Sequence, residues 1–302
     1  MRIVSLLPAA TEIVALLGAT DHLVGITHEC DFPDVVSSRA RVTKSAIADT
    51  HAPAAIDHAV RDAHETGVAL FTLDAKKITA LHPNVIVTQG LCEVCAVSEH
   101  DVRALAATLS PAPTIVSIGG GTLDGIYDDI RAVAHAIGAD DEADELLAGL
   151  RDRVKHVHET LKAAQAPRPR AALVEWSDPL YVGGHWVPEQ IKRAGGIDAL
   201  GVPGAHSVAV SMDALRAADP DIVLFAPCGY GVEAAAAEAK RCLALPEWSW
   251  LALSDKPLWA LDANGLTSRP GPRVVDGIEA MASIFAPTLF SEIEPWHAVR
   301  VK

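Results

Sequence analysis

The chain has 302 residues, of which 50% are hydrophobic and 21% are charged. Asp and Glu (39) outnumber Lys and Arg (25), which gives a formal net charge of −14. This composition excludes a disordered or fibrous chain, and the acidic balance argues against a partner such as nucleic acid or anionic lipid. The length corresponds to about two domains, and a small molecule or a protein is the expected partner.

The N-terminal segment bears on membrane insertion and export. No run of about 18 apolar residues is present, so we expect no membrane insertion. The apolar segment 1–7 is interrupted by Pro8, Thr11 and Glu12 before any cleavage site, which favours a first strand over a signal peptide. As written, the sequence predicts a cytoplasmic protein; a periplasmic or surface-anchored protein is expected if an export segment has been removed. Five cysteines are too few, and odd in number, for a disulfide scaffold, which favours reduced thiols.

Short apolar segments alternate with segments of helical periodicity through the first half of the chain. In chain order, the pattern predicts a strand over 2–7, a helix ending at Gly18, a strand over 24–27, a helix over 54–64, a strand over 68–73, a helix over 76–81, a strand over 85–88 and a helix over 98–109. This alternation predicts an α/β fold with a mostly parallel sheet.

Residues 122–164 are nearly all helix formers, and Gly138 is expected to divide them into two helices. A helix over 139–164 would be about 39 Å long at 1.5 Å per residue, which is enough to cross a domain. We therefore predict an N-terminal lobe over 1–121, connecting helices over 122–165 and a C-terminal lobe over 166–302. Gly119–Gly121 match no phosphate-binding motif and favour a flexible entry to these helices.

The second half of the chain repeats a sequence pattern of the first half. His82-Pro83-Asn84 leads into the strand 85–88 and then Cys92, while Asp219-Pro220-Asp221 leads into a strand over 222–224 and then Cys228. We expect two related lobes whose strand ends open toward one cleft, because open α/β sheets bind ligands at the carboxyl ends of their strands.

Cysteine and histidine residues follow two of these strands. Cys92 and Cys95 form a Cys-x-x-Cys pair ahead of a helix, a setting for metal binding or thiol redox chemistry, although buried cysteines are common. His28 and Cys30 follow the neighbouring strand and would complete a tetrahedral site for zinc or iron. A hydrogen-bonded structural histidine is the alternative. The zinc deaminase signature is absent, since Glu29 directly follows His28, and no Gly-x-Ser-x-Gly elbow supports a serine hydrolase.

Aromatic residues gather in one polar segment of the second half. Trp176, Tyr181 and Trp186 lie within eleven positions in a chain with only 5% aromatic residues, which indicates either a flat apolar ligand surface or packing within the loop. Trp248, Trp250 and Trp259 are expected in the core. One arginine of the segment 269–273 is expected either to reach the cleft or to serve in capping or salt bridging.

Taken together, these residues resemble the substrate-binding proteins of ABC importers that carry cobalamin, iron-siderophores or haem. The resemblance covers essentially the whole chain and is closest to the cobalamin-binding branch, whose members open like Arg2-Ile3-Val4-Ser5-Leu6-Leu7-Pro8-Ala9-Ala10-Thr11-Glu12. It implies two Rossmann-like lobes joined by one long helix, with the ligand in the cleft between them. The ligand-binding residues that it implies are His28, Glu29, Cys30, Phe32, Gln89, Leu91, Cys92, Trp176, Tyr181, Trp186, Cys228, Tyr230 and Arg269.

We therefore expect a non-catalytic protein that binds cobalamin or a related corrinoid, with the permease of an ABC importer as its partner. One alternative is a protein that binds a metal or metal chelate through His28, Cys30, Cys92 and Cys95, with zinc or iron as the metal. A second alternative is a thiol redox enzyme that uses Cys92 and Cys95.

Overall fold

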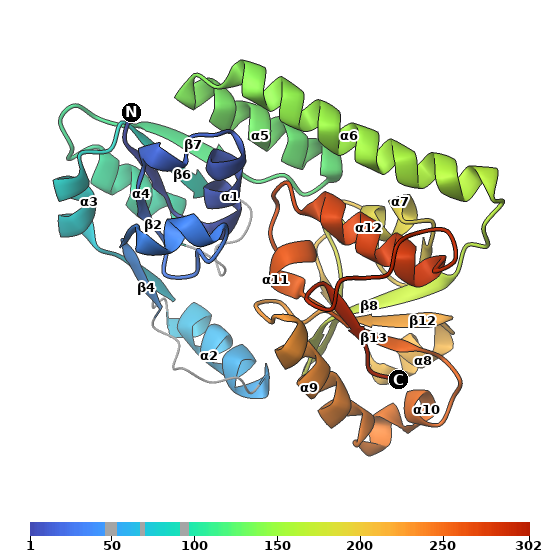
Figure 1. Ribbon diagram of the computed structural model, residues 1–302. Helices are drawn as coiled ribbons and strands as arrows, with labels where there is room; N and C mark the ends of the chain where they lie inside the picture. Colours follow the sequence, from blue (N-terminus) through green and yellow to red (C-terminus); the bar gives the residue numbers. More distant parts are fainter. Residues whose placement is uncertain (46–52, 67–69, 91–96) are drawn as a thin grey trace. The chain divides into compact units, whose positions relative to one another are not determined.

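The computed structural model describes residues 1–45, 53–66, 70–90 and 97–302. It confirms the predicted α/β class: two sheets with parallel strand pairs alternate with helices along the chain (Figure 1). The chain forms two compact units, one comprising residues 1–120 and 124–149 and the other residues 121–123 and 150–302. Each unit is described by itself below.

The first unit is built on a parallel sheet of five strands in the order β3-β2-β1-β6-β7. Its strands are β1 (Ile3–Ser5), β2 (Leu23–Ile26), β3 (Ala40–Arg41), β6 (Val85–Gln89) and β7 (Thr114–Ile118). A separate antiparallel pair joins β4 (Thr43–Ser45) to β5 (Phe71–Leu73). The helices and 3-10 turns are α1 (Pro8–Leu16), η1 (Thr20–His22), η2 (Asp34–Ser38), α2 (Pro53–Thr66), α3 (Ala75–Leu81) and α4 (Glu99–Ala106).

Local sequence explains how these elements begin and pack. Pro8 stands at the first turn of α1, where its missing N–H costs no helical hydrogen bond. The Asp74 side chain accepts a hydrogen bond from the backbone N–H of Lys77 and so caps α3. Val4 of β1 lies opposite Ile86 of β6, and both are fully buried in the core of this unit.

The helices α5 (Leu123–Ile137) and α6 (Asp140–Ala163) occupy the segment predicted to connect the lobes. The predicted break falls at Gly138, whose φ of 71° is a left-handed conformation that glycine adopts without strain. At the entry to α5, the backbone N–H groups of Gly119 and Gly120 donate to the Asp129 carboxylate at 3.0 and 2.7 Å. A side chain at Gly120 would overlap the backbone of Gly125, so this entry is closely packed.

The second unit contains a mixed sheet in the order β11-β9-β8-β12-β13-β14, with β10 paired to β8. The central strands β8, β12 and β13 are parallel, and β9, β11 and β14 add antiparallel edges. The strands are β8 (Arg170–Ser177), β9 (Leu180–Val182), β10 (Ile197–Asp198), β11 (Val208–Ala209), β12 (Ile222–Phe225), β13 (Leu258–Leu261) and β14 (Ala298–Arg300). The helices and one 3-10 turn are α7 (Val187–Arg193), α8 (Met212–Ala217), α9 (Val232–Leu243), η3 (Pro246–Trp248), α10 (Ser249–Ala252), α11 (Ala263–Leu266) and α12 (Val274–Phe285).

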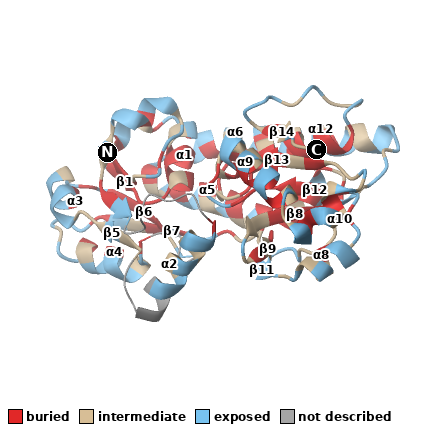
Figure 2. Cartoon of the chain, turned by 90° about the horizontal axis from the view of Figure 1, so that it is seen from below, coloured by how far each residue is buried: buried red, intermediate tan, exposed pale blue. Residues whose placement is uncertain are grey.

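The core of the second unit lies between the central strands and the helices that cover them. Phe225 and Trp248 are fully buried or nearly so and pack edge to face, with ring centroids 6.1 Å apart. Figure 2 shows the burial of β8 and β12, in contrast to the exposed residues of α8. Trp250 packs against this core and Trp259 is partly exposed, so the predicted core position is confirmed fully for Trp248.

A polar contact also joins α6 to this unit. The Arg153 guanidinium donates to the carboxylates of Asp276 and Glu279 on α12, with nitrogen–oxygen distances of 2.5 to 2.9 Å. The two carboxylates raise the pKa of Arg153 above its ordinary value, because their hydrogen bonds favour the charged guanidinium. The paired charges fix α6 against α12.

Truncating Phe225 tests the core of the second unit. Phe225→Ala should lower the free energy of unfolding by about 3 to 5 kcal/mol, since it removes a fully buried ring and leaves a cavity beside Trp248. Urea unfolding measured by circular dichroism gives the value. Leu253→Ala, at a position that is 87% exposed, is the matched control and should change stability by less than about 0.5 kcal/mol. Equal effects of the two variants would contradict this assignment of the core.

Candidate functional site

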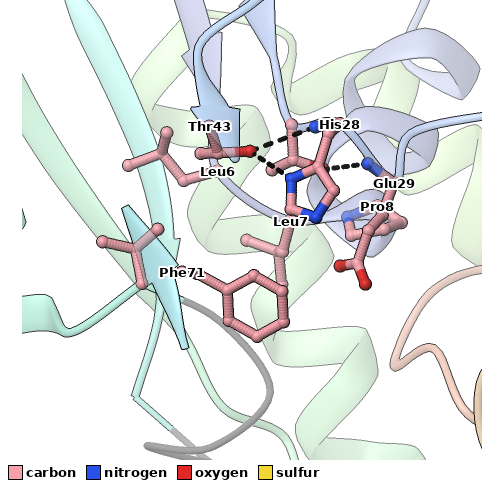
Figure 3. A pocket seen from close by; sticks show the side chains of 9 residues that line it. Leu6, Leu7, Pro8, His28, Glu29, Thr43 and Phe71 are labelled. Carbon is pink, nitrogen blue, oxygen red and sulfur yellow. Dashed lines mark hydrogen bonds between the residues drawn. The ribbon is translucent and has the colours of Figure 1, made fainter. Parts of the chain in front are cut away.

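In each unit, the parallel strands bring several loops to one edge of a sheet, which we call the carboxyl edge of that unit. In the first unit, residues 6–8 follow β1 and residues 27–33 follow β2. Both loops line a small pocket together with Thr43 of β4, Phe71 of β5 and Val97 (Figure 3). The pocket lies where the topology of an α/β sheet places ligands.

His28 is the residue of this pocket that the structure holds most firmly. Its backbone N–H donates to the Thr43 hydroxyl at 3.0 Å, and its Nδ1 lies 2.7 Å from the same oxygen (Figure 3). Its ring also packs on Phe71, with centroids 5.5 Å apart. Partial burial, with a smaller contribution from Arg41, lowers the pKa of His28 below 6.5. The side chain is therefore held as a neutral imidazole at neutral pH.

The other predicted residues of this edge differ in exposure. Glu29 is exposed and borders the pocket, Phe32 is 36% exposed, and Gln89 ends β6 in a partly buried position. Cys30 is 1% exposed, and its sulfur lies 3.0 Å from the Thr11 hydroxyl and 3.1 Å from that of Thr27. The Cys30 thiol is thus directed into the protein.

The cysteine pair that motivated the metal and redox hypotheses lies outside the described residues. This applies to Cys92 and Cys95, and also to Leu91. Within the part of the chain that the structure describes, no three His, Cys, Asp or Glu side chains form a group able to hold a metal ion. A zinc or iron site completed by His28 and Cys30 stays a prediction.

The carboxyl edge of the second unit is aromatic. Trp176, near the end of β8, packs edge to face on Tyr230 in the loop after β12, with ring centroids 5.9 Å apart. Tyr181 of β9 lies directly opposite Trp176 in the antiparallel register, so the two side chains share one face of the sheet. The Trp176 indole N–H donates to the carbonyl of Asp178 at 3.1 Å, which fixes the ring. Three predicted residues, from β8, β9 and the loop after β12, therefore gather here.

The remaining predicted residues of the second unit differ in burial. Trp186 is 4% exposed at the start of α7, where its indole belongs to the interior of the unit. Cys228 is exposed, and its N–H donates to the carbonyl of Glu175. Arg269 is partly buried in the segment between α11 and α12. The sequence-predicted aromatic loop thus contributes both exposed and core side chains.

The structure shows a polar cluster on the second unit that the sequence did not predict. The rings of His185 and His206 are 5.0 Å apart in an edge-to-face arrangement, and burial together with His206 lowers the pKa of His185. Next to it, the Ser207 hydroxyl donates to the carboxylate of Glu175 at 2.8 Å. His185 belonged to the predicted aromatic segment, but only β-sheet pairing brings residues 205–209 beside it.

No helix within the described residues combines the length and the apolar character needed to cross a bilayer.

The comparisons with known proteins agree with this architecture. The model of the periplasmic binding protein family matches residues 3–249, and the chain belongs to this family. A vitamin B12-binding protein of Vibrio cholerae serotype O1 is 24% identical over 282 residues, which cover 93% of this chain and 88% of that protein. The uncharacterized ABC transporter substrate-binding lipoprotein YvrC of Bacillus subtilis is 23% identical over 299 residues, which cover 96% of this chain and 82% of that protein.

Solved structures show the same fold at low sequence identity. A periplasmic haem-binding protein from Pseudomonas aeruginosa superposes with a TM-score of 0.74 at 21% identity, covering 99% of this chain and 97% of that one. The periplasmic vitamin B12-binding protein BtuF of Vibrio cholerae superposes with a TM-score of 0.64 at 22% identity, covering 94% and 96%. The resemblance stated from the sequence is therefore confirmed at the level of family and fold.

The lowered pKa of His28 leads to a prediction about pH. The unfolded chain takes up a proton near pH 6.5, whereas the folded chain binds it only at lower pH, so stability falls as the pH drops below about 6.5. NMR titration should give His28 an apparent pKa below 6.5, with the signal assigned by its loss in His28→Gln. The free energy of unfolding, measured with urea, should also fall less between pH 7.5 and 5.5 in this variant than in the wild type. A His28 pKa at or above 6.5 would contradict the burial seen here.

Proposed function

We propose that this protein is a non-catalytic binding protein for cobalamin or a related corrinoid. The observation that carries the proposal is the aromatic group of Trp176, Tyr181 and Tyr230 at the carboxyl edge of the second unit. The similarity to the vitamin B12-binding protein of Vibrio cholerae, over nearly the whole length of both chains, supports the choice of ligand.

The chemistry of the site residues suits a large amphipathic ring system. A corrin ring presents apolar faces and polar side groups, so its binding draws mainly on apolar burial, at about 25 cal/mol per Å² before the costs of association. Trp176 is partly exposed and held by its N–H to Asp178, so it offers ring surface without a large ordering cost. The His28 imidazole is neutral at pH 7, and a neutral imidazole nitrogen is a suitable ligand for cobalt or iron.

The proposed ligand-binding set is the one that the family resemblance implies from the sequence. It comprises His28, Glu29, Cys30, Phe32, Gln89, Leu91 and Cys92 from the first unit and Trp176, Tyr181, Trp186, Cys228, Tyr230 and Arg269 from the second. The burial of each residue indicates how it would contribute to binding. Accessible surface for contact with a ligand is offered by Trp176, Tyr181 and Glu29, whereas the buried side chains of Cys30 and Trp186 would support the site from the interior.

We further propose that the bound molecule is delivered to an ABC importer permease. The similarity to the Bacillus subtilis relative supports this, since that protein is named as an ABC transporter substrate-binding lipoprotein. That name and the family description also favour the exported alternative over the cytoplasmic one expected from the sequence. Fractionation of the native host tests location directly: recovery only with cytosolic markers would overturn an exported role.

Haem is the competing ligand, because haem-binding proteins are among the similar structures. An absorption titration of the reduced protein with aquocobalamin, cyanocobalamin and haem separates the two ligands. We expect saturable binding of both cobalamins and a shift of the cobalt-corrin bands with the aquo form. Saturable binding of haem with a flat response to both cobalamins would replace the corrinoid assignment by a haem assignment.

Trp176 tests where the ligand binds. Trp176→Ala should raise the dissociation constant for cyanocobalamin at least tenfold, since it removes the partly exposed ring of the aromatic group. Trp296→Ala is the matched control. This indole is 63% exposed and lies after α12 in the sequence, outside the aromatic group, so its loss should leave the affinity for cyanocobalamin unchanged. Equal affinities for the wild type and Trp176→Ala would remove the aromatic group from the ligand site.

A further inference from the structure

The second unit carries a groove that belongs to neither carboxyl edge. Its cavity volume is about 530 Å³, and its walls come from the starts of β12 and β13, the end of α12, strand β14 and the segment 287–295. Trp259, Ile284 and Ile293 supply apolar wall, while Glu292 and Arg300 supply one charge of each sign. The volume lies within the range of roughly 300–1,000 Å³ that is typical of small-molecule sites.

Strand direction separates this groove from the proposed corrinoid site. Ile222, the first residue of β12, and Pro257, just before β13, both line it, so it lies beside the amino ends of these parallel strands. Cys228 and Tyr230 instead follow the carboxyl end of β12.

The two sites also lie on opposite faces of the sheet. Ala260 of β13 packs with Tyr230 and with Ala235 of α9. Successive side chains of a strand point to opposite faces, so Trp259 points to the other face. There it lines the groove together with Ser283 and Ile284 of α12. A ligand in the groove therefore contacts none of the rings of the aromatic group.

The charged groups of the groove favour one sign of ligand. Arg300 is held on β14, opposite Trp259, and its Nε donates to the Lys302 carbonyl at 2.8 Å. This contact orients the guanidinium, whose other N–H groups form a planar fork suited to a carboxylate or sulfonate. Arg300 and Glu292 are both exposed, but Glu292 lies in a segment without regular structure. The better oriented charge is the positive one.

We propose that this groove is a second binding site, for a small amphipathic molecule with an aromatic body and a single anionic group. The aromatic body packs on Trp259, Ile284 and Ile293, and the anion pairs with Arg300. Aromatic ligands gain from offset stacking on an indole in addition to apolar burial. Binding here is independent of the corrinoid.

The probe for the test is 1-anilinonaphthalene-8-sulfonate, a fluorescent aromatic anion. We expect saturable binding to the folded protein that persists in the presence of excess cyanocobalamin. Ser283→Phe fills the groove from α12 and should abolish this binding, while Arg300→Gln should weaken it at least fivefold. Glu292→Gln removes a like charge and should tighten it about twofold.

The control is Arg216→Gln, which removes an exposed arginine of α8 outside the groove and should leave dye affinity unchanged. Circular dichroism and thermal unfolding establish that each variant is folded, and cyanocobalamin affinity, measured separately, keeps this test distinct from that of the proposed function. Dye affinity that is unchanged in both Ser283→Phe and Arg300→Gln would overturn the proposal. So would displacement of the dye by cyanocobalamin, or the absence of saturable binding to the wild type.

Discussion

Parallel strand pairing sets where the loops of both units gather. Because β1, β2, β6 and β7 all run in the same direction, the loops that follow them meet at one edge of the first sheet. The same holds for β8, β12 and β13 in the second unit. Residues as distant in sequence as Leu7 and His28, or Trp176 and Tyr230, come together for this reason. The loop residues at these edges can differ in chemistry, because buried Val, Ile and Leu side chains of the strands stabilise the sheets.

The two carboxyl edges offer different chemistry. The first combines a neutral, hydrogen-bonded imidazole at His28 with the exposed carboxylate of Glu29. The second carries the partly exposed rings of Trp176 and Tyr181, with the buried ring of Tyr230 packed against Trp176. Each kind of surface occurs in sites for amphipathic small molecules, where apolar area supplies affinity and placed polar groups supply orientation. Both are consistent with membership of the periplasmic binding protein family.

The two faces of the sheet in the second unit carry different features. The face that packs on α9 carries Ala260 and the aromatic group, while the opposite face carries Trp259 and the groove below the end of α12. The antiparallel strand β14 makes this possible, since it places Arg300 beside Trp259 at the sheet edge. The groove is therefore a surface of this unit separate from the candidate site at its strand ends.

Sequence alone was sufficient for the α/β class and the break at Gly138, because periodicity and glycine signals act over a few residues. It was also sufficient to recognise the resemblance to the family. It did not reveal β9, β11 and β14, or the contacts of His28 with Thr43 and Phe71 and of His185 with His206. Only the tertiary structure decided that Cys30 and Trp186 are buried while Trp176 keeps accessible surface. Burial and pairing between distant segments arise from packing of the whole unit, which no local pattern encodes.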